Sequence, residues 1–317
     1  MLRAYRVERG RLQKIDAGPT YDMDMLTTSL WVDLIAPDDT ERERVMSLYK
    51  QDIPESEDVE EIEASARYFK DEQGLHIHSL FLYNTEGRSK NVTVACTVTK
   101  DRLFTTRDVE LPDFRLLRMR ARHSAVNVGS PMDIMMNLIE IKVEHLADTL
   151  EDIYSGLEKV SHMVLEDAEA QLEDAIDELA ELEDTNGKVR LCLMDTQRSL
   201  SFLLREVRSR PDVQEHCREI LRDIDSLLAH TTFLFDKVNF LMDAAQNFIN
   251  IEQNQIIKIF SIAAVVFLPP TLIASIYGMN FQHMPELQWP WAYPAALVAM
   301  VIAGISPYFY FKRKGWL

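Results

Sequence analysis

The stretch IFSIAAVVFLPPTLIASIY, residues 259–277, holds nineteen residues without a charged side chain. As a helix rising about 1.5 Å per residue it would reach roughly 29 Å, close to the hydrocarbon thickness of a bilayer. A second uncharged stretch, residues 291–311, follows after a short polar segment. Soluble helices rarely stay uncharged over such lengths, so two buried core helices are the weaker interpretation. The sequence therefore predicts two transmembrane helices, 259–277 and 291–311.

Basic residues flank both stretches on one side only. Lys258 precedes the first, and Lys312, Arg313 and Lys314 follow the second, whereas the connecting loop 278–290 contains no lysine or arginine. Because short loops rich in lysine and arginine stay in the cytoplasm, both termini are predicted to be cytoplasmic and the loop to face outward. Residues 312–317 then form a basic cytoplasmic tail.

The net charge of −17 is distributed unevenly along the 317 residues. Residues 256–317 contain one acidic and four basic residues, a balance of +3, which leaves −20 for residues 1–255. An acidic body repels the phosphate backbone, so nucleic-acid binding is a poor hypothesis. The three cysteines, Cys96, Cys192 and Cys217, form no CxxC pair. This usage is typical of packing residues in a reducing compartment.

Residues 1–130 mix strand and helix patterns. The expected strands are 29–37, 75–83, 91–99 and 102–108, and the expected helices are 38–51 and 57–69. Acidic residues at the start of 38–51 suit the positive end of a helix dipole. These patterns predict a cytoplasmic α/β domain, either α+β or a three-layer sandwich.

From residue 131 onward the pattern becomes wholly helical. Apolar residues recur at spacings of three and four, which predicts an acidic helical hairpin over 131–210. Ten acidic residues and no basic one fall between Glu166 and Asp184. Such a run is typical of a solvated hairpin tip, although it would also attract cations.

Neither proline nor glycine interrupts the chain between Pro211 and Pro269. A stalk helix over 211–258 is therefore predicted to continue without a break into the first membrane helix. Pro269 and Pro270 remove backbone donors midway through that span, which predicts a kink or carbonyl groups freed toward the interior.

Almost every polar residue of this span falls in two rows of a seven-residue repeat. One row contains Asn247, Asn254, Ser261, Leu268 and Ser275, and the other contains Asp243, Asn250, Ile257, Ala264, Thr271 and Gly278. Two such rows form a seam along one side of a helix. In a membrane this polar seam either packs against other helices or lines water. Since two spans cannot enclose a hydrated path, a wet seam requires a homo-oligomer.

The segment after the first span carries a specific combination of motifs. Gly278-Met279-Asn280 follows Tyr277 and precedes the tetrapeptide MPEL at 284–287, FLPPT lies at 267–271, and the chain ends in FKRKGWL. Together with the two-span C-terminus and the acidic body, these residues resemble the CorA family of magnesium channels, in its proteobacterial branch. The resemblance covers essentially the whole chain.

The resemblance implies a fold and an activity. It implies a funnel-shaped homopentamer in the inner membrane, built from a cytoplasmic α/β/α sandwich domain, long stalk helices that become the inner transmembrane ring, and an outer ring from the second span. It also implies a passive, gated Mg²⁺ pathway that admits Co²⁺ and Ni²⁺, with no nucleotide or organic cofactor. Zinc-transporting relatives usually vary the middle residue of GMN, so the intact motif favours Mg²⁺ while leaving Zn²⁺ transport open.

The same resemblance places a selectivity filter at Gly278, Met279 and Asn280. Mg²⁺ holds its water shell tightly and prefers octahedral oxygen, so a filter gains by recognising the hydrated ion. Five Asn280 amide oxygens and the Gly278 carbonyls would form such a ring, and glycine permits a close or unusual backbone path. An isolated asparagine after glycine would otherwise be interpreted as a turn or helix C-cap. Glu286, the only acid of the outer loop, would concentrate cations at the mouth.

Further positions along the polar seam match the family. By the resemblance, Thr271 and Asn254 line the pore, Asp243 forms an acidic ring near its inner end, and Leu268 and Ile257 are apolar constrictions that gate by dewetting. Ser275 faces the same way by periodicity alone. The basic residues already named, Lys258, Lys312, Arg313 and Lys314, resemble a girdle around the cytoplasmic exit, although lipid-headgroup anchoring explains them equally well.

Gating is expected to depend on the acidic body. Facing carboxylates repel, so cytosolic Mg²⁺ bound between subunits would hold the closed state and its loss would loosen the ring. Glu219, in CREILRDID, falls where the family carries an acid of the intersubunit site, and Glu86 is the candidate partner. The alternative for Glu219 is a solvated stalk acid.

Other signals favour no further site. His76 and His78 share a strand face, but no third ligand lies at diagnostic spacing, so an exposed strand face is expected rather than a zinc site. The sequence contains no GxxxxGK[ST], GxGxxG or GxSxG motif, so no enzyme is predicted. The competing hypothesis is a membrane-anchored scaffold with acidic helices that bind a cytosolic partner.

Overall fold

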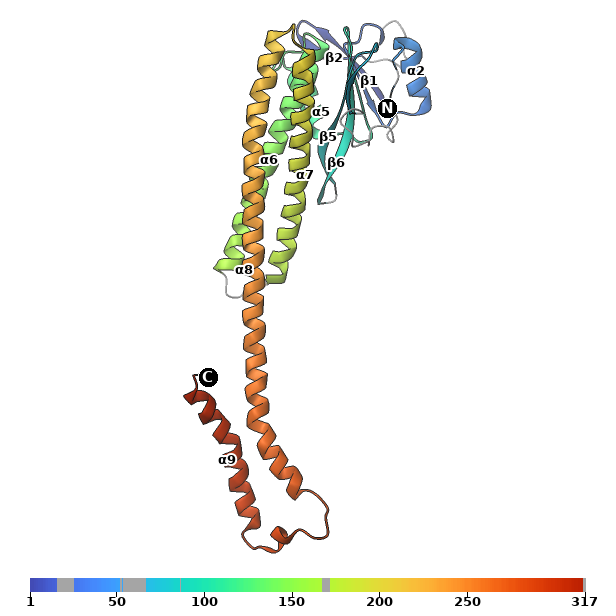
Figure 1. Ribbon diagram of the computed structural model, residues 1–317. Coiled ribbons are helices and arrows are strands. Elements are labelled where there is room, and N and C mark those ends of the chain that lie inside the picture. The colour runs from blue at the N-terminus through green and yellow to red at the C-terminus, as the bar shows by residue number, and fades with distance from the viewer. Residues whose placement is uncertain (16–25, 52, 54–66, 86, 167–171, 316–317) are drawn as a thin grey trace. The chain divides into compact units, whose positions relative to one another are not determined.

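The computed structural model describes residues 1–15, 26–51, 53, 67–85, 87–166 and 172–315 (Figure 1). The chain divides into two compact units, Met1–Met242 and Asp243–Leu317.

The first unit contains a sheet in which seven strands are described, in the order β2-β1-β3-β7-β6-β5-β4. Their bounds are β1 Leu2–Glu8, β2 Arg11–Lys14, β3 Trp31–Ile35, β4 Tyr68–Lys70, β5 Leu75–Thr85, β6 Arg88–Val98 and β7 Leu103–Arg107. The strands β5, β6 and β7 form the antiparallel meander that their alternating patterns predict. Among the described pairs, β3 with β7 is the parallel one.

Helices cover both faces of this sheet, which makes three layers (Figure 1). On one face, α2 (Asp39–Tyr49) buries Val45 against Val32, Leu34 and Phe104 of the strands. Asp38 and Glu41 close a reciprocal capping box at the start of α2, which fixes where the helix begins. The observed three layers agree with the predicted sandwich.

On the other face lie α5 (Pro112–Arg122), α6 (Pro131–Leu165) and α7 (Leu172–Glu206). Trp31 of β3 and Phe114 of α5 pack with ring centroids 6.1 Å apart. Alternate residues of β3 therefore face opposite layers, because successive side chains of a strand point to opposite sides. This is why the short strand WVDLI contributes to the packing on both faces of the sheet.

A buried ion pair lies between the sheet and α5. The guanidinium of Arg107 pairs with Asp33, and its carbon lies 3.6 Å from the Phe114 ring centroid. Asp33 also accepts a hydrogen bond from Thr105 Oγ1 at 2.8 Å, and Thr105 accepts one from Trp31 Nε1 at 2.9 Å. A buried charge is tolerated when it is paired in this way.

A second buried polar cluster joins α6 and α7 to the sheet. Asp195 of α7 accepts hydrogen bonds from Tyr68, from Ser79 and from the Leu80 backbone. The ammonium of Lys142, in α6, donates to Ser79 Oγ at 2.8 Å. Burial lowers the pKa of Lys142 and raises the pKa of Tyr68. The cluster fixes how α6 and α7 pack on β5.

The helix α8 runs from Pro211 to Tyr277, as the absence of proline and glycine from 212 to 268 leads one to expect. It continues across the boundary between the two units. The second unit contains its C-terminal part, the short 3-10 helix η1 (Pro285–Gln288) and α9 (Ala292–Arg313). Within the described residues, α8 and α9 are long and apolar enough to cross a membrane, and neither apolar stretch is buried in the chain. A soluble core helix would be buried instead.

Some elements of the first unit differ from those expected, and one expected helix falls mostly outside the described residues. The strands β1 and β2 and the helix α5 were not anticipated. Most of the helix expected at 57–69 lies outside the described residues, and Tyr68 and Phe69 belong to strand β4. These two residues pair with β5. Backbone pairing across strands therefore decides their conformation, rather than the helical pattern of the preceding residues.

Candidate functional site

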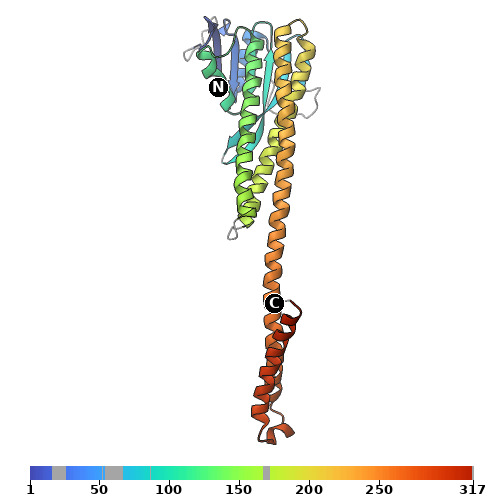
Figure 2. The same cartoon turned by 90° about the vertical axis from the view of Figure 1, so that its left-hand side faces the viewer.

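The C-terminal part of α8 carries the polar seam on the side away from α9. The helix α9 runs beside this part of α8 (Figure 1 and Figure 2). Within residues 259–277 of α8, the partly covered side chains are those of Ile262, Val266, Pro269, Pro270 and Ile273. At about 100° per residue, these positions and the seam lie on opposite sides of the helix. Every seam residue from Asp243 to Gly278 is exposed in the single chain.

The seam contains both polar and apolar positions, as the repeat predicts. Asp243, Asn254 and Ser275 are exposed members of its two rows. Leu268 and Ile257 lie among them and expose 64% and 61% of their surface. Both side chains are uncovered within one chain, as are those of their apolar neighbours Phe260 and Phe267. In a membrane span such side chains can face lipid, a partner helix or a narrow path.

Thr271 lies one residue beyond the proline pair. Its Oγ1 donates a hydrogen bond to the carbonyl oxygen of Phe267 at 2.7 Å. With its proton engaged in the helix, the hydroxyl oxygen offers lone pairs to the seam face. Thr271 therefore presents an acceptor, which suits the water shell of a cation.

The helix α8 ends directly before Gly278. The Gly278 N–H bonds the Ala274 carbonyl at 2.9 Å, and the Met279 N–H bonds the Ile276 carbonyl at 3.3 Å. A Cβ atom on Gly278 would lie 3.1 Å from the Ala274 carbonyl oxygen. The close approach expected of this glycine is therefore present. Its φ lies outside the left-handed region, so of the two paths that glycine permits, the close approach is the one seen here.

Asn280 is exposed just beyond this helix end. The last carbonyl groups of a helix lack intrahelical partners, and the helix dipole places partial negative charge there. The amide of Asn280 therefore stands where a cation is favoured without a carboxylate. Glu286 lies in η1 and is exposed on the same loop.

The basic residues fall at two separate places in the chain. Lys258 lies in α8, Lys312 and Arg313 occupy the last turn of α9, and Lys314 follows as its C-cap. Positive charge at a helix C-terminus complements the dipole. This local stabilisation accounts for the α9 residues within one chain, and their girdle role remains a proposal.

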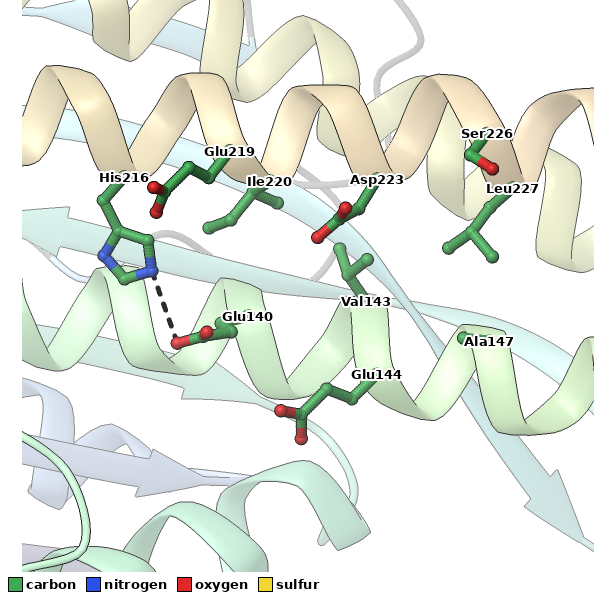
Figure 3. Close-up of a pocket in the computed structure, with 10 residues that line it drawn as sticks. All are labelled: Glu140, Val143, Glu144, Ala147, His216, Glu219, Ile220, Asp223, Ser226 and Leu227. Atoms are coloured by element: carbon green, nitrogen blue, oxygen red, sulfur yellow. Dashed lines mark ion pairs between the residues drawn. The ribbon is translucent and has the colours of Figure 1, made fainter.

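Glu219 lines a groove of about 540 Å³ between α6 and α8 (Figure 3). Glu140, Glu144, His216 and Asp223 share the groove with it. The Nε2 atom of His216 lies 3.3 Å from Oε2 of Glu140. The companions of Glu219 were not predicted, although the four-residue spacing from Glu219 to Asp223 and from Glu140 to Glu144 places each pair on one helix face.

The groove is not a preformed metal cage. Within residues 1–15, 26–51, 53, 67–85, 87–166 and 172–315, no group of three or more His, Cys, Asp or Glu side chains is arranged to hold a metal ion. The carboxylates around Glu219 offer oxygen ligands of the kind that Mg²⁺ prefers. Glu86, the proposed partner, lies outside the described residues.

The histidine pair of β5 is not an exposed strand face, as was expected. His76 and His78 are both buried. The ring of His76 stacks on Phe69, and its two nitrogens lie 2.9 Å from Asp71 Oδ1 and 3.1 Å from Thr97 Oγ1. Both nitrogens are occupied, so His76 serves the packing of β4 on β5.

The cysteines are free and buried. Burial raises the pKa of the thiol to about 12 for Cys96 and Cys192 and to about 11 for Cys217. Such thiols stay protonated and unreactive. The prediction that they are packing residues is confirmed.

Comparison with known proteins identifies the family. A family model described as CorA-like Mg2+ transporter protein matches residues 27–313. The chain is 53% identical over 319 residues to the magnesium transport protein CorA of Salmonella typhimurium and 52% identical to that of Escherichia coli K12, with all of each chain covered. These relatives are named as transport proteins, in agreement with the prediction that the chain is no enzyme.

A solved structure shares the fold. The complete structure of the CorA magnesium transporter from Methanocaldococcus jannaschii matches with a TM-score of 0.77 at 19% identity. The match covers 100% of this chain and 99% of that one. The likeness extends over the α/β domain, the long helix and the two apolar C-terminal helices. By the matched family model and this identity along its whole length, the chain belongs to the family of CorA-like Mg2+ transporter proteins.

Proposed function

We propose that the chain is a passive Mg²⁺ uptake channel of the inner membrane, with both termini cytoplasmic. Five copies assemble around an axis so that their polar seams line a common path. The observation that carries this proposal is the seam itself. It is polar, exposed in one chain, turned away from α9, and it leads to Gly278-Met279-Asn280 at the end of α8. That the ion is Mg²⁺ is inferred from the relatives, which are named magnesium transport proteins.

The proposed filter recognises Mg²⁺ with its water shell intact. Asn280 offers a neutral amide oxygen, and the end of the α8 dipole adds partial negative charge beside it. Neutral acceptors allow a divalent ion to leave again, whereas a ring of carboxylates would hold it. Co²⁺ and Ni²⁺ are also expected to permeate, because their hydrated ions are octahedral and similar in size. Glu286 concentrates cations at the outer mouth.

Along the path, each seam residue has a role. Thr271, Ser275 and Asn254 offer acceptors to water, and Asp243 collects cations at the inner end. Leu268 and Ile257 form rings that dewet when narrowed and so close the path. Lys258 and the basic end of α9 surround the exit, where they also meet lipid headgroups.

Flux into sealed vesicles that contain only the purified full chain tests permeation. With a Mg²⁺-sensitive dye inside, the wild-type protein should admit Mg²⁺, and Asn280→Ala should lower the initial rate about ten-fold or more, because the acceptor ring is lost. Gln288→Ala is the matched control, since it removes an exposed amide from the same loop. A scaffold predicts no flux at all, and unchanged flux in Asn280→Ala would refute the filter assignment.

The same vesicles distinguish Mg²⁺ from Zn²⁺ transport. Rates with each ion alone, at equal concentration, give the preference directly. We expect Mg²⁺ to permeate at least about as fast as Zn²⁺, since carboxylate, carbonyl and water ligands suit Mg²⁺ while Zn²⁺ favours nitrogen and sulfur. Zn²⁺ flux without Mg²⁺ flux would assign the chain to zinc transport instead.

Regulation is proposed to use the acidic groove around Glu219. Two carboxylates about 6 Å apart repel by roughly 3 kcal/mol at an effective dielectric of 20, and Mg²⁺ bound between subunits removes this repulsion. Cytosolic Mg²⁺ therefore favours the closed assembly. Glu219 and its groove companions Glu140, Glu144 and Asp223 supply carboxylate oxygens, which are the ligands that Mg²⁺ prefers.

Limited proteolysis tests this regulation without measuring flux. Millimolar Mg²⁺ should slow cleavage of residues 1–255, and Glu219→Gln should weaken that protection. Glu215→Gln is the matched control, because Glu215 lies one turn away on α8 and pairs with Arg218 and Arg222 rather than lining the groove. A digestion pattern that Mg²⁺ leaves unchanged would count against the regulatory role.

A further inference from the structure

Gly304 of α9 lies against the proline pair of α8. A Cβ atom built on Gly304 would lie 3.3 Å from Cγ of Pro270 and 3.6 Å from the carbonyl oxygen of Val266. Both helices belong to the second unit at these positions. The first distance is tighter than ordinary van der Waals contact, so a larger residue here requires Pro270 or the helix that carries it to move by a few tenths of an ångström.

Pro270 deprives the Val266 carbonyl of its usual helical hydrogen-bond donor. In an α-helix the N–H of residue 270 would donate to this oxygen, but proline has no N–H. A freed carbonyl inside a membrane must be satisfied by neighbouring groups. Gly304 presents to it a backbone without a side chain, which permits the weak Cα–H to carbonyl contact that recurs at helix–helix interfaces. Gly304 thus lies against α8 at the position where its proline pair interrupts the backbone hydrogen bonding.

The contact between Gly304 and Pro270 influences the position of the C-terminal end of α8. From Pro270 to Gly278 the helix extends about 12 Å, so a tilt of about 10° at the prolines displaces Gly278 by roughly 2 Å. Binding sites generally need their groups held within about 0.5 Å. A tilt at the Gly304 contact is therefore transmitted to Gly278 and to the residues that follow it.

We propose that Gly304 is a positioning residue of the permeation path: its contact with Pro270 and Val266 fixes the direction of the last turns of α8 and so the placement of Asn280. The proposal rests on the proposed function, because it assumes that Asn280 meets the ion. Gly304 itself touches no ion, since α9 packs on the side of α8 opposite to the polar seam.

Substitution at Gly304 tests the proposal against two matched controls. The test variant is Gly304→Ala. Gly187→Ala makes the same change at a glycine of α7 where a Cβ meets nothing within 4 Å. Ala299→Val adds bulk to α9 at an exposed position on its other side. Alanine is the better helix former, so helix propensity alone predicts no loss from Gly304→Ala.

In vesicles, Gly304→Ala should lower the Mg²⁺ rate about five-fold and change the ratio of Mg²⁺ to Co²⁺ rates about two-fold or more, because the filter is displaced rather than removed. Gly304→Val should do both more strongly. The two controls should stay within about two-fold of wild type, as surface changes away from tight contacts do. A lower rate at an unchanged ion ratio would indicate a merely structural role and would overturn the proposal.

A double-mutant cycle tests whether the effect passes through Pro270. Pro270→Ala removes the ring that a Cβ on residue 304 would strike, and it restores an N–H for the Val266 carbonyl. In that background, adding Gly304→Ala should change the Mg²⁺ rate by less than about two-fold, which is the coupling expected of residues in direct contact. Independent, multiplicative effects would contradict the proposed contact.

Thiol labelling separates this proposal from the proposed function. In Met279→Cys, a polar thiol reagent reports the exposure of the filter segment, and the natural cysteines interfere little because they are buried. Adding Gly304→Ala should change the labelling rate about three-fold or more, while adding Gly187→Ala should not. If the wild-type chain carried no Mg²⁺, the proposed function would be wrong. Labelling would still show whether Gly304 fixes the position of the segment that contains Met279 and Asn280. An unchanged labelling rate would refute the role of Gly304.

Discussion

Asp195 of α7 and Ser79 of β5 meet inside the first unit, with Oδ2 of the carboxylate 2.6 Å from the hydroxyl oxygen. The same oxygen accepts the Leu80 N–H at 2.8 Å, and Oδ1 lies 3.3 Å from Arg67. The ammonium of Lys142 reaches the cluster through Ser79. One buried carboxylate therefore joins two helices to the sheet and offsets the charge of buried Lys142 and of partly buried Arg67.

Asp195→Ala should lower the free energy of unfolding by about 3–5 kcal/mol, because it leaves buried positive charge uncompensated. Asp184→Ala, on the same helix, should change it by less than about 0.5 kcal/mol, since Asp184 pairs with Lys188 at the surface. Denaturant unfolding of the detergent-solubilised full chain, followed by circular dichroism, measures both. Equal stability losses in the two variants would contradict the assignment.

His145 of α6 gives the first unit a pH-dependent contribution to stability. Its Nδ1 lies 3.1 Å from the buried carboxylate of Asp113, and this hydrogen bond raises the pKa of His145 above its ordinary value of 6.5. The stabilising contribution is therefore complete below pH 6.5 and is lost as the pH rises through the folded-state pKa. His145→Gln should cost about 1 kcal/mol more at low pH than at high pH.

Unfolding midpoints of His145→Gln and wild type, measured well below pH 6.5 and again near pH 9, check this sign. His123→Gln is the control, because His123 is exposed just after α5. A difference that is the same at both pH values would show that the charge of His145 does not contribute.

Thr271 is expected to act through its lone pairs. Its proton is held by the Phe267 carbonyl, so Thr271→Val keeps the shape and removes the acceptor. The Mg²⁺ rate should fall about three-fold or more, whereas Thr271→Ser should remain near wild type, because serine restores the hydroxyl. Vesicle flux measures both, and a serine variant as poor as valine would point to packing instead.

Leu268 is expected to close the path by excluding water. Leu268→Asn should let Mg²⁺ enter even when millimolar Mg²⁺ faces the acidic domain, because a polar ring does not dewet. Vesicles loaded with Mg²⁺ inside test this, with Leu297→Asn of α9 as the matched change away from the polar seam. Normal inhibition in Leu268→Asn would exclude this residue as a gate.

Glu286 is expected to act by its charge alone. Glu286→Gln should lower the Mg²⁺ rate about two-fold at low ionic strength and hardly at all at 1 M salt, where the Debye length is about 3 Å. Flux measured over a salt series checks this. A defect that persists at high salt would show direct coordination of the ion.

Much of α8 and of its polar seam could be predicted from the sequence because membrane helices obey strict local rules. The uncharged lengths, the absence of proline and glycine between 212 and 268, and the seven-residue repeat determine α8 and its polar seam without reference to any distant residue. The motif Gly278-Met279-Asn280 indicated the family, and the comparisons confirm it.

Other features escaped because distant parts of the chain decide them. His76 and His78 looked exposed, but stacking of Phe69 and the cover of neighbouring elements bury them. Tyr68 and Phe69 followed a helical pattern, yet pairing with β5 makes them a strand. The companions of Glu219 became visible only when α6 and α8 were brought side by side.

The sequence by itself determined the two apolar spans, the continuous helix that joins the acidic body to the first of them, and the polar seam with its terminal motif. All of these follow from composition and from periodicity within one segment. Only the tertiary structure decided which face of α8 is covered by α9. It also decided that Gly304 lies against Pro270 and that Asp195 joins α6 and α7 to the sheet. These are contacts between residues far apart in the chain, and packing geometry, which no local pattern encodes, selects them.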